Sequence, residues 1–132
     1  MAEQNGDLTT PGKIEIYDDV VKTIAGLAAS KVDGICGMKG GLIKGAVQAV
    51  TGQKNYGAGV EVGRDAAANF TIDLHVIIDY GAKINEVAAK AQKIVKEQVE
   101  ELTGRAVGAV NIHVADIRLP EELLKPVGNA NP

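Results

Sequence analysis

The stretch that decides the fold is Asn69–Tyr80, which reads NFTIDLHVIIDY. Apolar and polar residues alternate along it, and the apolar set comprises Phe70, Ile72, Leu74, Val76, Ile78 and Tyr80. Because successive side chains of a strand point to opposite faces, this period of two predicts a long strand with one buried face. The other face carries the polar residues Thr71, Asp73, His75 and Asp79.

On the C-terminal side of this strand, the sequence predicts a helix and then a second strand. Apolar residues recur every three or four positions between Asn85 and Gly104, which is typical of an amphipathic helix capped by Asn85 and ended by the glycine. Beyond it, apolar residues alternate from Val110 and then change phase at Ile117. A β-bulge near Ala115–Asp116 explains this change of phase.

On the N-terminal side, the pattern predicts shorter elements. Lys13–Ile16 alternates as a short first strand does, and Asp18 or Asp19 is placed to cap a helix with apolar positions Val20, Val21, Ile24, Leu27 and Ala28. Ile35 begins a brief strand, and Gly41–Thr51 has a helical spacing. Val60–Val62 is expected to form a hairpin with the long strand across Arg64–Ala68.

The predicted order is therefore β-α-β, a glycine-rich insert, then β-β-α-β. Two amphipathic helices and a half-solvated sheet favour an α+β two-layer sandwich with a mixed sheet. Regular elements leave residues 1–11 and 121–132 as flexible tails. Residues 12–120 are expected to form a single domain with the glycine-rich insert at 34–63, which holds nine of the sixteen glycines.

Composition restricts the chemistry of the chain. Its 132 residues carry a net charge of −3 and only 3% aromatic residues, so a stacking platform for single-stranded nucleic acid is hard to build. The polar start of the chain lacks the apolar core of a signal peptide, and no apolar run is long enough to span a bilayer. We therefore expect a cytoplasmic protein that does not cross the membrane.

Candidate catalytic and metal-binding residues are few. The single serine, Ser30, has no histidine near it in sequence, and Cys36 is interpreted as a small buried hydrophobic residue. His75, His113 and a nearby aspartate could hold zinc or iron, but neither histidine belongs to a compact ligand motif. We expect no enzymatic activity, no catalytic residue, no cofactor and no metal.

The glycine-rich region differs in charge from the rest of the chain. Between Lys31 and Lys54, four lysines and one aspartate give +3, so the remainder carries −6. The sequence Gly37–Gly40 has the GXXG form of the clamp in KH domains, which makes an RNA-binding regulator the alternative function.

Partner binding is the other interpretation of this region. Lysines and small residues surround a few apolar side chains in Gly37–Val50, a composition suited to packing on another protein. With the histidines of the polar strand face, the predicted partner-binding residues are Met38, Lys39, Leu42, Ile43, Lys44, Val47, His75 and His113.

Several motifs together resemble the alkaline shock proteins of Gram-positive bacteria, also described as envelope stress response proteins. The motifs are Gly12–Ile16, Val20–Ala25, Val32–Ile35, Asp73–Gly81, Gln98–Gly104 and Val110–Val114. The resemblance covers about Gly12 to Glu122. It implies a non-enzymatic cytoplasmic stress protein that acts as an interaction or scaffold protein.

The resemblance also carries expectations about partners. Members of this family are held near the membrane by a small transmembrane anchor protein, and some self-associate. It therefore implies that this chain reaches the inner face of the cell membrane through a partner. It implies no DNA binding and no catalytic or metal-binding residues.

Overall fold

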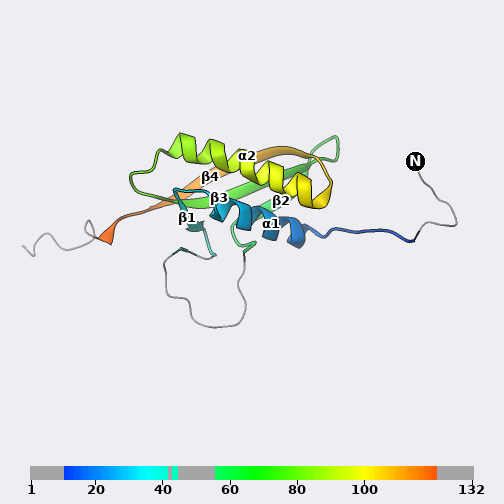
Figure 1. Ribbon diagram of the computed structural model, residues 1–132, viewed down its shortest axis with the longest axis horizontal. Coiled ribbons are helices and arrows are strands. Elements are labelled where there is room, and N and C mark those ends of the chain that lie inside the picture. Colours follow the sequence, from blue (N-terminus) through cyan, green and yellow to red (C-terminus); the bar gives the residue numbers. More distant parts are fainter. Residues whose placement is uncertain (1–10, 42, 45–55, 122–132) are drawn as a thin grey trace, which may run out of the picture.

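Two helices and a four-stranded sheet form two layers in the computed structural model, which describes residues 11–41, 43–44 and 56–121 (Figure 1). The elements are α1 Asp18–Ser30, β1 Ile35–Met38, β2 Val60–Arg64, β3 Phe70–Asp79, α2 Ile84–Thr103 and β4 Val107–Arg118. Both helices lie on the same side of the sheet. The α+β two-layer sandwich predicted from the sequence is therefore confirmed.

The strand β3 is the centre of the sheet. Its residues alternate between buried and half-buried along the whole element, as the period of two predicts. It pairs in parallel with β4 and antiparallel with both β1 and β2, so the sheet is mixed. Since β4 occupies one side of β3 over its full length, β1 and β2 must share the other side.

The strands β1 and β2 are two halves of one edge strand. Met38 lies opposite Val76 and Val60 lies opposite Leu74, which leaves only His75 between the two pairings. The Lys39 N–H donates to the His75 carbonyl at 2.9 Å, and the His75 N–H donates to the Gly59 carbonyl at 2.8 Å. Lys39 and Gly59 thus make together the two hydrogen bonds that one residue would make in an unbroken antiparallel strand.

The chain between these two residues, 40–58, is called the insertion. Its ends meet so closely that only glycine fits at position 59. A Cβ there would lie 2.8 Å from the Lys39 carbonyl oxygen, and the backbone has a φ of +82°, which side chains other than glycine rarely adopt. The glycine-rich region predicted at 34–63 is therefore bounded by strand at both ends.

The core lies between the helices and the covered face of the sheet. The helix α2 contributes Val87, Ala91, Val95 and Val99, which recur every four residues and so line one face of the helix. The helix α1 contributes Val21 and three small residues, Ala25, Ala28 and Ala29. These pack with the apolar face of β3, whose Ile72, Leu74, Val76 and Ile78 are fully buried.

Three local predictions are confirmed. The hairpin joins β2 to β3, with Arg64 opposite Phe70 and the Asp65 carboxylate accepting the N–H groups of Ala67 and Asn69 in the turn. The register of β3 and β4 shifts between Val114 and Asp116, where the sequence predicts a bulge. Gly104 ends α2 in a left-handed conformation with a φ of +71°.

Other local predictions are wrong. Lys13–Ile16 forms no strand: Ile16 packs against the core, whereas the Ile14 side chain is 84% exposed and has no strand edge beside it. The helices are preceded by Tyr17 and Lys83, neither of which caps through its side chain, so the predicted caps Asp18, Asp19 and Asn85 lie inside the first turns. Most of the helix predicted at Gly41–Thr51 lies outside the described residues.

Candidate interaction surface

The face of the sheet that the helices leave uncovered carries a polar cluster from three strands. His75 on β3 and His113 on β4 are directly opposite each other in the parallel register. Asp73 and Asn111 form the neighbouring pair on the same strands, and Glu61 of β2 lies on the far side of β3. Cross-strand neighbours on one face are close enough to interact, so these residues form a single surface.

The two histidines stack on each other within this cluster. Their ring centroids are 4.7 Å apart and the ring planes differ by 17°. His113 Nε2 lies 2.9 Å from Asp73 Oδ1, which also accepts a hydrogen bond of 3.1 Å from the Asn111 amide. The hydrogen bond from His113 lowers the pKa of the Asp73 carboxyl below its ordinary value. On the other side, His75 Nε2 lies 3.7 Å from a Glu61 carboxylate oxygen.

A second polar cluster ties the start of the insertion to the far end of the sheet. The Arg118 side chain of β4 pairs with Asp79 of β3 at 3.0 Å and also donates a hydrogen bond to the Lys44 carbonyl. The Lys44 N–H in turn donates to the Cys36 carbonyl at 2.6 Å. The side chain of Arg118 therefore links both sheet edges across β3.

Cys36 lies close to this cluster and is fully buried, as predicted. Its Sγ lies 3.4 Å from the Ile77 carbonyl oxygen. Burial raises the pKa of the thiol above its ordinary value, although the positive charge of Arg118 partly opposes the shift. Since the thiolate is the nucleophile, this environment disfavours a reactive cysteine.

The structure brings most of the described candidate residues together. The backbone of Lys39 is hydrogen-bonded to that of His75, and Ile43 forms an isolated antiparallel bridge with Gly37. Lys39 and Lys44 are exposed, and the stacked histidines lie beside them on the open face. Met38 is different, because its side chain packs in the core with only 4% exposed, so it does not face a partner. Leu42 and Val47 lie outside the described residues.

The two competing chemical interpretations find no support in this geometry. Within the described part of the chain, no three histidine, cysteine, aspartate or glutamate side chains gather to hold a metal ion. Gly37 and Met38 belong to β1, and the Gly41 N–H closes a turn on the Met38 carbonyl. The GXXG sequence therefore continues a strand, whereas the clamp of a KH domain joins two helices.

Sequence reasoning missed two features of the surface. The Arg118–Asp79 pair depends on the register of β3 and β4, and the only available signal was that both residues flank the predicted polar face. The second feature is an apolar hollow of about 360 Å³ on the helical side, between α1 and α2. It is lined by Ile24, Leu27, Ala28, Lys31, Ile94, Gln98 and Leu102.

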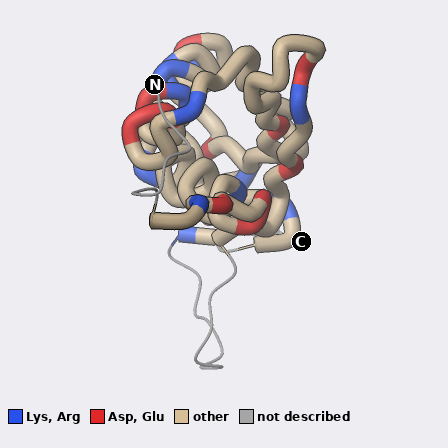
Figure 2. The backbone as a smooth tube through the Cα atoms, turned by 90° about the vertical axis from the view of Figure 1, so that its right-hand side faces the viewer, with Lys and Arg blue, Asp and Glu red and all other residues tan. Residues whose placement is uncertain are grey.

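Charge is spread rather than gathered on the described chain, with lysine, arginine, aspartate and glutamate interspersed around it (Figure 2). Helices cover one face of the sheet, and the other displays paired polar side chains beside the insertion. The molecule is thus a small two-layer α+β domain with one sheet face left open.

The chain belongs to the alkaline shock protein 23 family, which has a cell envelope-related function, and the match covers residues 7–119. The resemblance to alkaline shock proteins is thereby confirmed. The chain is 38% identical over 112 residues to the Bacillus subtilis protein YloU, covering 84% of this chain and 92% of YloU. It is 36% identical over 107 residues to YqhY of the same species, covering 81% and 78%.

A third relative has a more specific name. The stress response regulator gls24 homolog of Streptococcus pyogenes is 31% identical over 120 residues, which is 88% of this chain and 65% of that protein. No solved structure is significantly similar to this chain. In the described residues, no helix is both long enough and apolar enough to cross a membrane.

Proposed function

We propose that this protein acts without catalysis, as an interaction protein of the envelope stress response that a membrane-bound partner recruits. Its family has a cell envelope-related function, and one relative is named as a stress response regulator. Recruitment by a partner would bring the chain to the inner face of the membrane.

One observation carries this proposal: the insertion and the histidine pair share one surface. The two ends of the insertion are hydrogen-bonded to the backbone of His75, whose imidazole stacks on His113 at the open face. A partner that contacts the start of the insertion therefore also meets the polar cluster of β3 and β4. We call this combined area the root surface, formed by Lys39, Ile43, Lys44, His75 and His113.

The chemistry of the root surface suits a polar, reversible contact. Lys39 and Lys44 present positive charge at its edge, and the Glu61 side chain, 75% exposed, presents negative charge beside His75. The Asp73 and Asp79 carboxylates already pair with His113 and Arg118. A partner is thus expected to engage the exposed lysines and Glu61, because paired groups would first have to give up their present contacts.

The burial of Cys36 supports a role without nucleophilic catalysis. The thiol is inaccessible and its pKa is raised by burial, so little thiolate exists at neutral pH. The serine hydroxyl of Ser30 donates to the Leu27 carbonyl within its own helix. Neither group has the activated, accessible setting of a catalytic nucleophile.

Reversal of charge on the root surface tests the proposal. A tagged full chain is expressed in Bacillus subtilis, and its distribution between membrane and soluble fractions is measured after mild crosslinking. We expect the unaltered chain in the membrane fraction. The double variant Lys39→Glu/Lys44→Glu should move to the soluble fraction, because it reverses the charge that the partner meets.

The matched control is Lys90→Glu/Lys93→Glu, which makes the same change of charge on exposed positions of α2. This control should fractionate as the unaltered chain does. The proposal fails if the unaltered chain remains soluble, or if both double variants lose the membrane association equally.

A further inference from the structure

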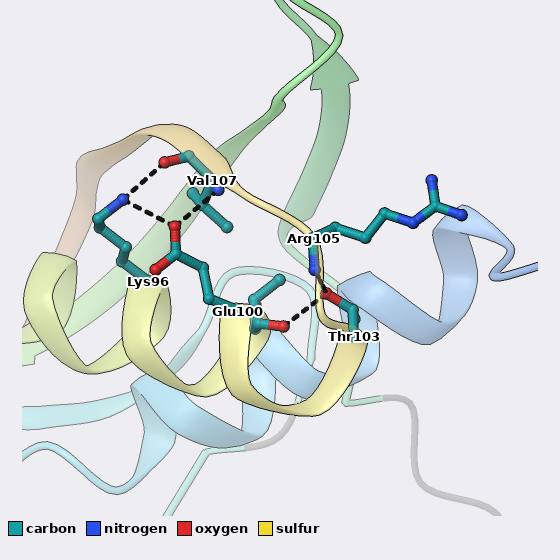
Figure 3. Close-up of polar contacts among 6 residues, drawn as sticks. Lys96, Glu100, Thr103, Arg105 and Val107 are labelled. Atoms are coloured by element: carbon teal, nitrogen blue, oxygen red, sulfur yellow. Dashed lines mark hydrogen bonds and ion pairs between the residues drawn. The ribbon is translucent and has the colours of Figure 1, made fainter. Parts of the chain in front are cut away.

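The outer edge of β4 is finished differently in its two halves. In the described residues, β4 pairs only with β3, so its other side has no neighbouring strand. Where β4 begins, α2 side chains take its outward backbone groups (Figure 3). The Lys96 ammonium donates to the Val107 carbonyl at 2.8 Å, and the Glu100 carboxylate accepts the Val107 N–H at 2.9 Å. The Gln92 amide donates to the Val110 carbonyl at 2.9 Å.

This capping stops at Val110, although β4 continues to Arg118. Since the Val110 carbonyl points away from β3, the backbone groups of Ile112 and Val114 also point outward, because alternate residues of a strand face the same side. No described residue hydrogen-bonds these outward groups. After the bulge, the Asp116 carboxylate accepts the Ile117 N–H at 2.8 Å, so the free stretch is short.

The usual devices that protect a strand edge are missing from this stretch. Natural edge strands carry charges, prolines or covering segments that prevent pairing with another chain. The segment Gly108–Ala115 contains no proline, aspartate, glutamate, lysine or arginine. Ile112 and Val114 are β-branched, which favours pairing, and the Val114 side chain is 38% exposed. The edge is therefore open between two protected ends.

We propose that a second copy of this chain pairs with β4 at this open stretch, in antiparallel fashion about a two-fold axis at His113. A two-fold interface uses the same patch on both copies, so one contact satisfies both open edges. Ile112 of each copy would lie opposite Val114 of the other and exchange both backbone hydrogen bonds with it. The two sheets would then continue as one.

The side chains of the stretch agree with this pairing. It places a β-branched residue against a β-branched residue on the helical side and one imidazole beside another on the open side. No like formal charges oppose each other at neutral pH, since the nearest acidic residue on β4 is Asp116. The pairing ends on each side where the edge is already occupied, by Gln92 at Val110 and by Asp116 at Ile117. This proposal does not depend on the root surface.

Removal of one outward N–H tests the pairing. In Val114→Pro the missing N–H points away from β3, and the strand conformation accepts proline at an edge. We expect the full chain to be a dimer by sedimentation equilibrium, and the variant to associate at least about tenfold more weakly, as loss of one or two hydrogen bonds predicts. Val114→Thr keeps the N–H and should still dimerise. A monomeric unaltered chain, or an undiminished dimer of a folded Val114→Pro chain, overturns the proposal.

A crosslinking experiment tests the register without proline. Directly opposite residues that do not exchange hydrogen bonds have Cα atoms about 4.5 Å apart, so His113→Cys should form a disulfide between copies under mild oxidation. Asn111→Cys should not, because its two copies would lie about 14 Å apart along the strands. The unaltered chain is a further control, since Cys36 is buried. Crosslinking of Asn111→Cys but not of His113→Cys overturns the two-fold register.

Discussion

One edge of the sheet is built from two short strands, β1 and β2, whereas the other is the single strand β4. The first edge is interrupted opposite His75, and Gly37 of β1 also forms a bridge with Ile43. The second edge is continuous over Val107–Arg118 and depends on side chains of α2 for its covering. The comparison shows that one small domain can limit edge pairing either by breaking a strand or by capping it.

The largest expected effect comes from closing the break in the first edge. Gly59→Ala places a Cβ 2.8 Å from the Lys39 carbonyl oxygen at a φ of +82°. We expect a loss of about 3 kcal/mol in the free energy of unfolding, measured by urea denaturation, because steric contact adds to backbone strain. Gly81→Ala is the control: it has a φ of +97° but nothing within 4 Å of its Cβ. If the two variants lose equal stability, the close contact at Gly59 does not matter.

An intermediate effect comes from uncapping the second edge. Lys96→Met removes the donor to the Val107 carbonyl, and the lost hydrogen bond should cost about 1 kcal/mol in urea denaturation. Lys93→Met changes an exposed lysine of the same helix and should cost less. A Lys93→Met chain as unstable as Lys96→Met would show that the cap contributes nothing.

The same variant has a pH signature. The hydrogen bond from Lys96 lowers the pKa of Glu100, with the Val107 N–H as the second cause. A carboxyl with a lowered folded pKa stabilises the protein above its unfolded pKa of about 4.3, and this contribution is lost as the pH falls through the folded pKa. Lys96→Met should therefore flatten the acid loss of stability. An unchanged pH profile between the two chains would contradict this linkage.

A local effect is expected where Arg118 links the two edges. Arg118→Gln removes the side-chain contacts with Asp79 and the Lys44 carbonyl. We expect faster amide hydrogen exchange at Lys44, whose N–H is bonded to the Cys36 carbonyl. The Tyr80 N–H is bonded to the backbone carbonyl of residue 118 and serves as the internal control. Equal acceleration at both amides would indicate general loosening of the sheet rather than release of the link.

The smallest effect is expected at the centre of the open face. Asp73→Asn removes the charge that accepts the hydrogen bond from His113, and exposed pairs of this kind contribute about 0–1 kcal/mol. Because the pKa of Asp73 is lowered, its contribution is present above about pH 3.9 and disappears as the pH falls through the folded pKa. The difference in stability between the two chains should therefore shrink in acid. Glu97→Gln on α2 controls for loss of one exposed carboxylate.

Strong local periodicity explains what the sequence could predict. The alternation along β3 and the four-residue spacing of buried positions in α2 each reflect a single buried face, so they were visible without a partner element. The bulge in β4 was also visible, as a change of phase at Ile117. Lys13–Ile16 misled because two alternating isoleucines carry no information on whether a strand edge is available beside them.

The missed features depend on contacts between distant residues. Nothing local indicates that Met38 and Val60 continue one strand, since their common neighbour is His75 of β3. The candidate site was predicted in part, because the polar face of β3 identified His75 and the matching phase of β4 identified His113. The reach of Arg118 to the insertion required the register, and the burial of Met38 required the bulge between Ile35 and Gly37.

The junction of Lys39 and Gly59 has a consequence for how this domain can vary. Together these residues fill one position of an edge strand, so a chain that joins Met38 to Val60 through a single residue would keep the pairing with β3. The segment 40–58 is thus a cassette whose length can change at low cost, because the entropy of closing a loop grows only slowly with its length. Sequences of different size, or a reporter domain, can be exchanged at this point while the sheet register stays the same.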